Sequence, residues 1–205
     1  MNSMFTGLVE ATGRIARAQP TARGRQLRID TPLGAELGAG ESIAVSGVCL
    51  TVTTSDAGGF SADVSPETLR VTSLGSRPVN GIVNLERPLR ADSRLGGHFV
   101  LGHVDAVGRI ATLRSDGDCF WLEVDVPATL APLMISKGSV AVDGISLTVV
   151  ALLPAGIAVQ IVPFTWSHTS LQEARPGDAV NLEADVIGKY VARLMEERQP
   201  VENLR

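Results

Sequence analysis

Aromatic residues are scarce in this chain of 205 residues, of which Phe, Trp and Tyr together make up 4%. Basic residues are not in excess either, because 18 Lys and Arg stand against 22 Asp and Glu, a formal net charge of −4. Proteins that bind nucleic acid need a basic surface or aromatic side chains that stack on bases. The composition therefore argues against a nucleic-acid partner.

Cysteine is also rare, and Cys49 and Cys119 alone cannot form a disulfide framework, which favours a reducing compartment. We expect no signal peptide, because no basic segment followed by an apolar run begins the chain. The longest apolar stretch, residues 139–162, is interrupted by Asp143, Pro154 and two glycines. It predicts two buried strands around a turn rather than a membrane span. We expect a soluble, cytoplasmic protein.

What the chain does have is an internal repeat. The block SGVCLTV at residues 46–52 returns as DGISLTV at residues 143–149, 97 positions later. VNLE recurs at the same offset, beginning at Val83 and Val180, and an upstream GLVEATGRI returns from Gly102 as GHVDAVGRI. A single repeat of this length indicates a duplicated domain rather than a solenoid, whose periods are roughly 20 to 50 residues. Two copies of one pocket suit a protein that binds two copies of one ligand.

Short runs of Val, Ile, Leu and Thr, separated by Gly, Pro, Asp and Ser, fill both halves. Such runs predict strands joined by turns, and hence an all-β sandwich or small barrel in each half. Residues 56–59 and 154–156 occupy matching positions and predict hairpin turns. The boundary between the halves is expected near residues 94–97.

The segment from Val186 onward breaks this β pattern. Its apolar residues have helical spacing, and they are Val186, Ile187, Tyr190, Val191, Leu194 and Met195. Asp185 is placed to cap the helix, and Pro200 lies beyond its end. We predict that this helix packs against the same helix of other subunits; packing on its own barrel is the alternative.

Hydroxyl groups recur at equivalent positions of the two halves and indicate a polar, uncharged ligand. The pairs are Thr51 and Thr148, Thr68 and Thr165, and Thr72 and Thr169. Threonine also favours strands for its β-branching alone, so a structural role is the competing explanation. Gly7 and Gly102 would permit close backbone approach to a ligand, or would form bulges.

The halves diverge at positions that carry groups for proton transfer. Cys49 stands opposite Ser146, Leu8 opposite His103, Ser46 opposite Asp143, and Glu67 opposite Phe164. Two passive sites would have little reason to diverge here, so we predict different chemical roles for the two ligands. Cys49 would be a nucleophile if its thiolate is favoured, whereas most strand cysteines are small apolar residues.

The remaining polar candidates do not form a metal or cofactor site. His98 and His103 are five residues apart, so on an extended chain they point to opposite faces, and no acidic cluster completes a ligand set. We expect His103 to be an acid, base or hydrogen-bond donor and His98 to be structural. Lys137 contacts a ligand oxygen or is solvated. No phosphate loop or dinucleotide motif is present, and we expect no cofactor.

Taken together, these motifs resemble the riboflavin synthase family of the α-chain type. The resemblance runs from Met4 to about Leu194, and its blocks are MFTG, SGVCLTV, GGHFVLGHVD, DGISLTV and VNLE in order. It implies two tandem six-stranded Greek-key β-barrels and a C-terminal helix that assembles a homotrimer. The corresponding domains are residues 1–97, 98–185 and 186–205.

The resemblance also implies a reaction without a cofactor. Two molecules of 6,7-dimethyl-8-ribityllumazine dismutate, one giving four carbons to the other, and riboflavin and 5-amino-6-ribitylamino-pyrimidinedione are the products. In the family, the productive pair lies between the first barrel of one subunit and the second barrel of its neighbour. A non-catalytic lumazine- or flavin-binding antenna protein built on the same barrels is the alternative.

Site residues follow from the matching motifs. Those expected to matter for turnover are Phe5, Ser42, Cys49 and His103. The expected first-barrel pocket consists of Gly7, Leu8, Val9, Cys49, Leu50, Thr51, Asp63, Val64, Ser65, Pro66, Glu67 and Thr68. The expected second-barrel pocket consists of Gly102, His103, Val104, Lys137, Ser146, Leu147, Thr148, Ile161, Val162, Pro163, Phe164, Thr165 and Trp166. We hypothesise that proton transfers and ring opening occur beside Cys49 and Ser42, assisted by His103 of the partner subunit.

Two features depart from the family pattern. Met1, Asn2 and Ser3 precede the motif at which the family usually begins, and they could crowd a pocket that uses the N-terminus. Ser167 stands where the family often has an acidic residue, which puts local contacts in doubt.

Overall fold

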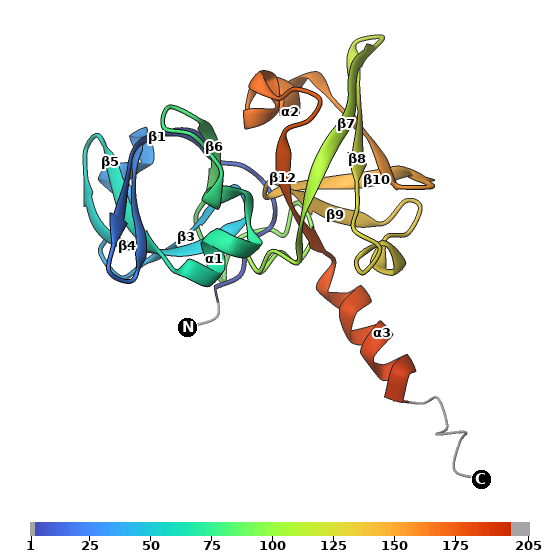
Figure 1. The fold of residues 1–205 in the computed structure, drawn as a ribbon, viewed down its shortest axis with the longest axis horizontal. Helices are drawn as coiled ribbons and strands as arrows, with labels where there is room; N and C mark the ends of the chain where they lie inside the picture. The colour runs from blue at the N-terminus through green and yellow to red at the C-terminus, as the bar shows by residue number, and fades with distance from the viewer. Residues whose placement is uncertain (1–2, 198–205) are drawn as a thin grey trace.

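The computed structural model describes residues 3–197, which form two closed β-barrels and a C-terminal helix (Figure 1). The first barrel consists of β1 (Ala11–Thr21), β2 (Gly24–Asp30), β3 (Ser42–Val45), β4 (Val48–Asp56), β5 (Gly59–Val64) and β6 (Ile82–Glu86). The second consists of β7 (Ala106–Asp116), β8 (Cys119–Asp125), β9 (Ser139–Val142), β10 (Ile145–Leu153), β11 (Gly156–Ile161) and β12 (Ala179–Ala184).

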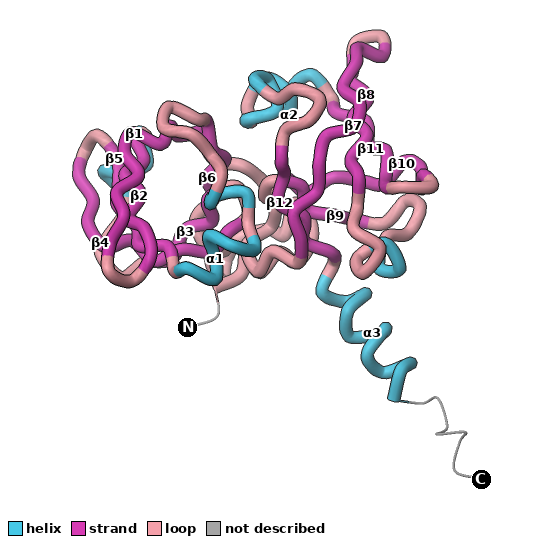
Figure 2. Tube along the Cα trace, in the orientation of Figure 1, coloured by secondary structure: helices cyan, strands magenta, loops and turns pink. Residues whose placement is uncertain are grey.

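Both barrels have the same order of neighbouring strands, β1-β2-β5-β4-β3-β6 and β7-β8-β11-β10-β9-β12. The hairpin turns expected at residues 56–59 and 154–156 join β4 to β5 and β10 to β11. The predicted pair of six-stranded Greek-key barrels is confirmed. Figure 2 shows the two barrels side by side, with strands in magenta.

Alternation along the strands decides which side chains fill the barrels. In β4, Val48, Leu50 and Val52 are buried in the first core, whereas Cys49 is half-buried and Thr51 is exposed. Successive strand residues point to opposite faces, so Cys49 and Thr51 share the outer face of the barrel. The repeat places Ser146 and Thr148 on the outer face of β10 in the same way.

Short helices interrupt the strands and were not predicted. They are η1 (Pro32–Glu36), α1 (Pro66–Val71), η2 (Ser73–Gly75), η3 (Ala131–Leu133), α2 (Pro163–Ser167) and η4 (Ser170–Glu173). In α1, the Ser65 hydroxyl accepts a hydrogen bond from the Thr68 amide (3.1 Å), and Pro66 occupies the first helical turn. Helices of six residues or fewer are too short to produce a visible hydrophobic period.

The predicted C-terminal helix is present as α3 (Val186–Glu197). The Ile187 amide donates to Asp185 Oδ1 (3.0 Å), which is the expected cap. The helix projects away from both barrels (Figures 1 and 2), and its apolar stripe is exposed. Packing on its own barrel therefore does not cover the stripe. Pro200 and the rest of the predicted tail, like Met1 and Asn2, lie outside the described residues.

Two asparagines, equivalent in the repeat, join the barrels reciprocally. Asn84 Nδ2 donates to the Asp143 carbonyl oxygen (2.9 Å), and Asn84 Oδ1 accepts from the Ser170 amide (2.7 Å). Asn181 makes the matching bonds to the Ser46 carbonyl oxygen (2.8 Å) and the Ser73 amide (2.7 Å). All four bonds are buried, so they fix how the two barrels sit against each other.

Gly47 and Gly144 meet where the two halves approach most closely. Both have positive φ, of 77° and 76°, in the turns before β4 and β10. A Cβ added to Gly47 would lie 2.7 Å from the Gly144 nitrogen, and the reverse distance is 2.6 Å. Glycine is therefore required at both positions for backbone conformation and for space. Among residues 3–197, no helix is long and apolar enough to span a membrane.

Candidate active site

Each barrel is covered by an extended segment that belongs to the other half of the repeat. The first crossing segment (residues 5–9) places the Gly7 carbonyl oxygen 2.8 Å from the Ser146 amide of β10, and Val9 packs on the core of the second barrel. The second crossing segment (residues 100–105) places the Gly102 carbonyl oxygen 2.9 Å from the Cys49 amide of β4. Val104 packs on the first core.

This exchange corrects the predicted grouping of the site residues. Residues 7–9 were expected beside Cys49, and residues 102–104 beside Ser146; the structure pairs them the other way round. A Cβ on Gly7 would meet Ser146 Cβ at 2.6 Å, and one on Gly102 would meet Cys49 Cβ at 2.6 Å. Gly102, the residue before His103, therefore reaches Cys49 of the first barrel within one chain.

The two crossing segments pair with each other where they pass. Phe5 forms an antiparallel bridge with Val100, with N···O distances of 2.7 and 3.1 Å. Phe5 is fully buried in a small cluster with Ala44, Val100 and Ala141, against which Cys49 packs. The Phe5 side chain thus holds the segments and the Cys49 strand together, instead of facing an open pocket.

We call the expected first-barrel pocket the first half-site and the expected second-barrel pocket the second half-site. The first half-site lies on the outer face of β3 and β4. Ser42 pairs with Thr51, and its side chain hydrogen-bonds to the Cys49 thiol. Burial raises the pKa of this thiol, and the Ser42 hydrogen bond only partly offsets that effect. Cys49 is therefore a neutral thiol near neutral pH, suited to donating or relaying a proton more than to nucleophilic attack.

The second half-site presents the equivalent face of β10. The Ser146 hydroxyl lies 2.7 Å from His98 Nδ1, and burial lowers the pKa of His98. His98, expected only as a structural residue, thus contacts a predicted binding residue.

Lys137 is exposed, and its backbone has a positive φ of 64°. The equivalent position in the first half is Gly40, for which positive φ costs little. A non-glycine residue held in this conformation has a higher backbone energy.

The far edges of the half-sites are the strand ends at residues 63–68 and 161–166. In the second, Phe164 is 70% exposed and stacks on His168 (ring centroids 3.9 Å apart), while Trp166 stacks on Phe120 (3.8 Å). Figure 1 shows α1, at the end of the first edge, below the first barrel, and α2, at the end of the second, above the other barrel. The two far edges therefore lie on different sides of the molecule in this view.

Some recurring or divergent positions have structural roles that the sequence did not reveal. The Thr72 and Thr169 hydroxyls donate to the carbonyl oxygens of Thr68 and Thr165 (2.6 and 2.7 Å), so they close the short helices instead of facing a ligand. Ser46 is buried where the barrels meet, and Asp143 lies opposite it in the repeat. Neither belongs to the site for proton transfer.

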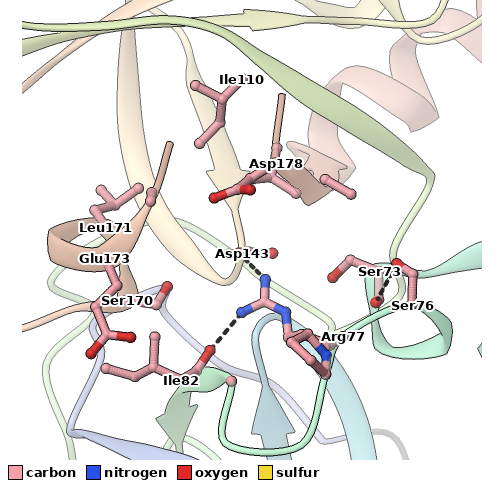
Figure 3. Close-up of a pocket in the computed structure, with 15 residues that line it drawn as sticks. Ser73, Ser76, Arg77, Ile82, Ile110, Asp143, Ser170, Leu171, Glu173 and Asp178 are labelled. Carbon is pink, nitrogen blue, oxygen red and sulfur yellow. Dashed lines mark hydrogen bonds and ion pairs between the residues drawn. The ribbon is translucent and has the colours of Figure 1, made fainter. Parts of the chain in front are cut away.

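Asp143 instead forms a buried ion pair with Arg77 across the barrel interface (Figure 3). Arg77 also donates to the Ile82 carbonyl oxygen (2.7 Å). Arg77 and Asp143 both line a cavity of about 290 Å³ between the barrels. A second hollow, of about 480 Å³, lies between Val126 and Ile157 at one end of the second barrel. Neither cavity is lined by a residue of the two expected pockets.

We expect Arg77→Met to reduce the free energy of unfolding by about 2–4 kcal/mol, because it leaves the buried Asp143 carboxylate without its charged partner. Urea denaturation would measure the difference. Arg23→Met, which removes an exposed guanidinium from the β1–β2 turn, serves as the control and should change stability by less than about 0.5 kcal/mol. Equal stability of the Arg77 variant and the wild type would contradict a stabilising role for the pair.

Comparisons with known proteins agree with this duplicated architecture. The lumazine binding domain family matches the chain twice, at residues 6–88 and 101–185. The riboflavin synthase of Actinobacillus pleuropneumoniae is 40% identical over 205 residues, with 98% of this chain and 95% of that protein covered. The riboflavin synthase of Mycobacterium tuberculosis (strain H37Rv) is 44% identical over 197 residues, covering 94% and 98%.

Solved structures of LumP share the fold. LumP complexed with riboflavin superimposes with a TM-score of 0.82 at 21% identity, covering 88% of this chain and 98% of that chain. LumP complexed with 6,7-dimethyl-8-(1'-D-ribityl) lumazine gives a TM-score of 0.80 at 20% identity, with the same coverage. At such identity, the likeness establishes the architecture of the two barrels.

Proposed function

The chain belongs to the riboflavin synthase family, and from this premise we propose how its two barrels divide the reaction. It is an enzyme that converts two molecules of 6,7-dimethyl-8-ribityllumazine into riboflavin and 5-amino-6-ribitylamino-pyrimidinedione. One lumazine binds at the first half-site, beside Cys49 and His103, and the other at the second, beside Ser146 and Lys137. The observation that carries this division is the exchange of crossing segments, which gives the two half-sites different polar groups.

The reacting pair forms between half-sites of two different chains. Within one chain, α1 and α2, which follow the far edges of the two half-sites, lie on different sides of the molecule (Figure 1). A homotrimer, assembled through the exposed stripe of α3, brings the first half-site of one subunit against the second half-site of the next. Holding the pair in register supplies much of the rate enhancement, because it replaces a bimolecular encounter with a fixed geometry.

Proton transfers and ring opening occur on the first barrel. His103 extends from the second crossing segment, whose Gly102 carbonyl oxygen accepts a hydrogen bond from the Cys49 amide, and we assign it the role of acid and base. Ser42 and Cys49 supply neutral hydrogen-bond groups beside it. Phe5 supports this site from beneath by fixing the crossing segments.

Cys49→Ser should lower kcat only about 2- to 10-fold and leave the pH profile unchanged between about pH 6 and 8, because thiol and hydroxyl are both neutral there. Steady-state rates of riboflavin formation across this range would measure it. Cys119→Ser, at the β7–β8 hairpin, is the matched control. A loss of activity above about 10³-fold, at Cys49 alone, would instead indicate a thiolate nucleophile.

The direct test of the function uses the purified full chain and 6,7-dimethyl-8-ribityllumazine with no additive. We expect catalytic appearance of riboflavin, followed by absorbance. Tight binding without riboflavin would support the antenna protein, which the relatives do not favour. The same experiment after removal of residues 1–3 would test whether they obstruct the site.

We further propose that the protein is located in the cytoplasm. Its domains would be residues 1–97 for the first barrel, 98–185 for the second barrel and 186–205 for the helix and tail.

A further inference from the structure

Glu10 and Asp105 are equivalent in the repeat, and each lies at the end of a crossing segment, but their charged partners differ. In the first half, Glu10 Oε1 accepts from the Arg87 amide (3.0 Å), and Glu10 Oε2 accepts from the Arg87 guanidinium (2.8 Å). In the second half, Asp105 Oδ2 accepts from the Ala184 amide (2.8 Å), and its charged partner is Lys189 of α3, whose Nζ is 2.7 Å away. The bond to the backbone is retained, and the source of the positive charge has changed.

This change of partner follows from the sequence. Ala184 stands where the first half has Arg87, so β12 offers no guanidinium to Asp105. In the chain, β6 is followed by β7, whereas β12 is followed directly by α3. Lys189 lies in the first turns of α3, and its amide donates to the Asp185 carbonyl oxygen (3.3 Å). The carboxylate that a strand neighbour holds in the first half is therefore held by the C-terminal helix in the second half.

The ion pair between Lys189 and Asp105 is partly shielded from water. The two side chains are 25% and 24% exposed, and partial shielding makes an ion pair stronger than one on an open surface. Asp105 is also fixed through its backbone, because its amide donates to the Leu182 carbonyl oxygen (2.9 Å). The pair thus joins α3 to a defined point at the end of the second crossing segment.

Only a short piece of chain separates this point from the first half-site. Asp105 is three residues from Gly102, whose carbonyl oxygen accepts from the Cys49 amide (2.9 Å). Three residues span at most about 10 Å, so a displacement of Asp105 is transmitted to Gly102. Between them, Val104 packs on the first core, and His103 precedes it in the chain. The contact with α3 therefore restricts the residues that the segment places on the first barrel.

We propose that Lys189 and Asp105 are positioning residues for the reaction, and that α3 holds the second crossing segment against the first barrel through their ion pair. The proposal rests on the proposed function, in which His103 of this segment is the acid and base. It gives α3 a second task besides the proposed assembly of subunits. The apolar stripe of the helix would bind neighbouring subunits, while Lys189 fixes part of the first half-site of its own chain.

Amide hydrogen exchange in the substrate-free full chain tests the proposal independently of turnover. The Cys49 amide reports on the second crossing segment through its bond to Gly102, and the Ser146 amide reports on the first through its bond to Gly7 (2.8 Å). In Lys189→Met, which keeps the aliphatic stem without the charge, we expect the Cys49 amide to exchange about 3- to 10-fold faster. The Ser146 amide should keep its wild-type rate. Lys189→Arg, which retains the charge, should restore slow exchange at Cys49.

Arg28→Met is the matched control for the loss of an ion pair. Arg28 is 19% exposed and bonds to Asp56 (2.7 Å), at the end of β4 far from Cys49. This variant should leave exchange at Cys49 within about twofold of the wild type. Unchanged exchange at Cys49 in Lys189→Met, or equal acceleration in Arg28→Met, would overturn the proposal whether or not the protein forms riboflavin.

Kinetics provide the second readout. In Lys189→Met, kcat should fall about 3- to 10-fold with KM changed less than about threefold, because the segment that carries His103 is held less firmly. Lys189→Arg should recover the wild-type kcat, and Arg28→Met should retain it. An unaltered kcat in Lys189→Met would show that the ion pair does not position groups for the reaction.

Sedimentation of Lys189→Met separates this role from assembly, since the variant should have the same mass as the wild type. If the mass differs or the variant does not fold, Asp105→Asn decides. It changes the crossing segment and not the helix, and its amide oxygen can still accept from the Ala184 amide. Faster exchange at Cys49 with wild-type mass would support the proposal. Wild-type exchange, or a change of mass in this variant too, would overturn it.

Discussion

His103→Gln is expected to lower kcat for riboflavin formation by about 10²- to 10³-fold, the contribution typical of a positioned acid–base group. Glutamine keeps a polar side chain of similar reach but cannot gain and lose a proton near neutral pH. The other histidines of residues 3–197 cannot replace it, because His98 and His168 lie at the second half-site. Steady-state kinetics over a range of lumazine concentrations would separate kcat from KM, which should change less than about threefold.

The same substitution at His168 provides the comparison. His168 is exposed on the second barrel, and its loss should alter kcat less than about threefold. If His103→Gln keeps the wild-type kcat, the first half-site does not perform the proton transfers. A large increase in KM at constant kcat would assign His103 to binding alone.

Aspartate at both Val191 and Leu194 is expected to dissociate the proposed trimer and to reduce activity by about 10³-fold or more. The two side chains are 54% and 59% exposed in the isolated chain, on a stripe that includes Ile187 and Tyr190. Burying two carboxylates in an apolar interface is prohibitively unfavourable, so the subunits would separate. Without a neighbour, the two half-sites cannot bring a donor and an acceptor lumazine together.

Analytical ultracentrifugation would distinguish a chain of 21.5 kDa from an assembly of about three times that mass, at the concentration used for the assay. Arg193→Asp adds a carboxylate to the same helix away from the stripe and should leave the trimer intact. An active protein that sediments as a monomer would refute the proposed division of the reaction between subunits.

The strands were predictable because each carries its own local information. Residues that alternate between apolar and polar, such as those from Val48 to Val52, specify both the strand and its buried face. The helix at Val186 was predictable from its spacing and from the cap at Asp185. The sequence repeat between the two halves indicated that both barrels share one topology.

The exchange of crossing segments could not be read from the repeat. Equivalent segments have equivalent sequences, so residues 7–9 are compatible with either barrel, and only the packed structure assigns them to Ser146 instead of Cys49. For the same reason, the repeat did not reveal that Asn84 and Asn181 join the two barrels. Their identical VNLE blocks were visible, but a buried polar strand residue does not indicate which distant backbone groups it will bond.

The exchanged segments also set an order of events during synthesis. At roughly 5–20 residues per second, the first barrel leaves the ribosome seconds before the second is complete. Until residues 100–104 emerge, the Cys49 amide lacks its Gly102 acceptor and the first core lacks Val104. The nascent first domain therefore has all six strands of its barrel, but its Cys49 amide is unpaired and part of its core is uncovered until the opening residues of the second domain arrive.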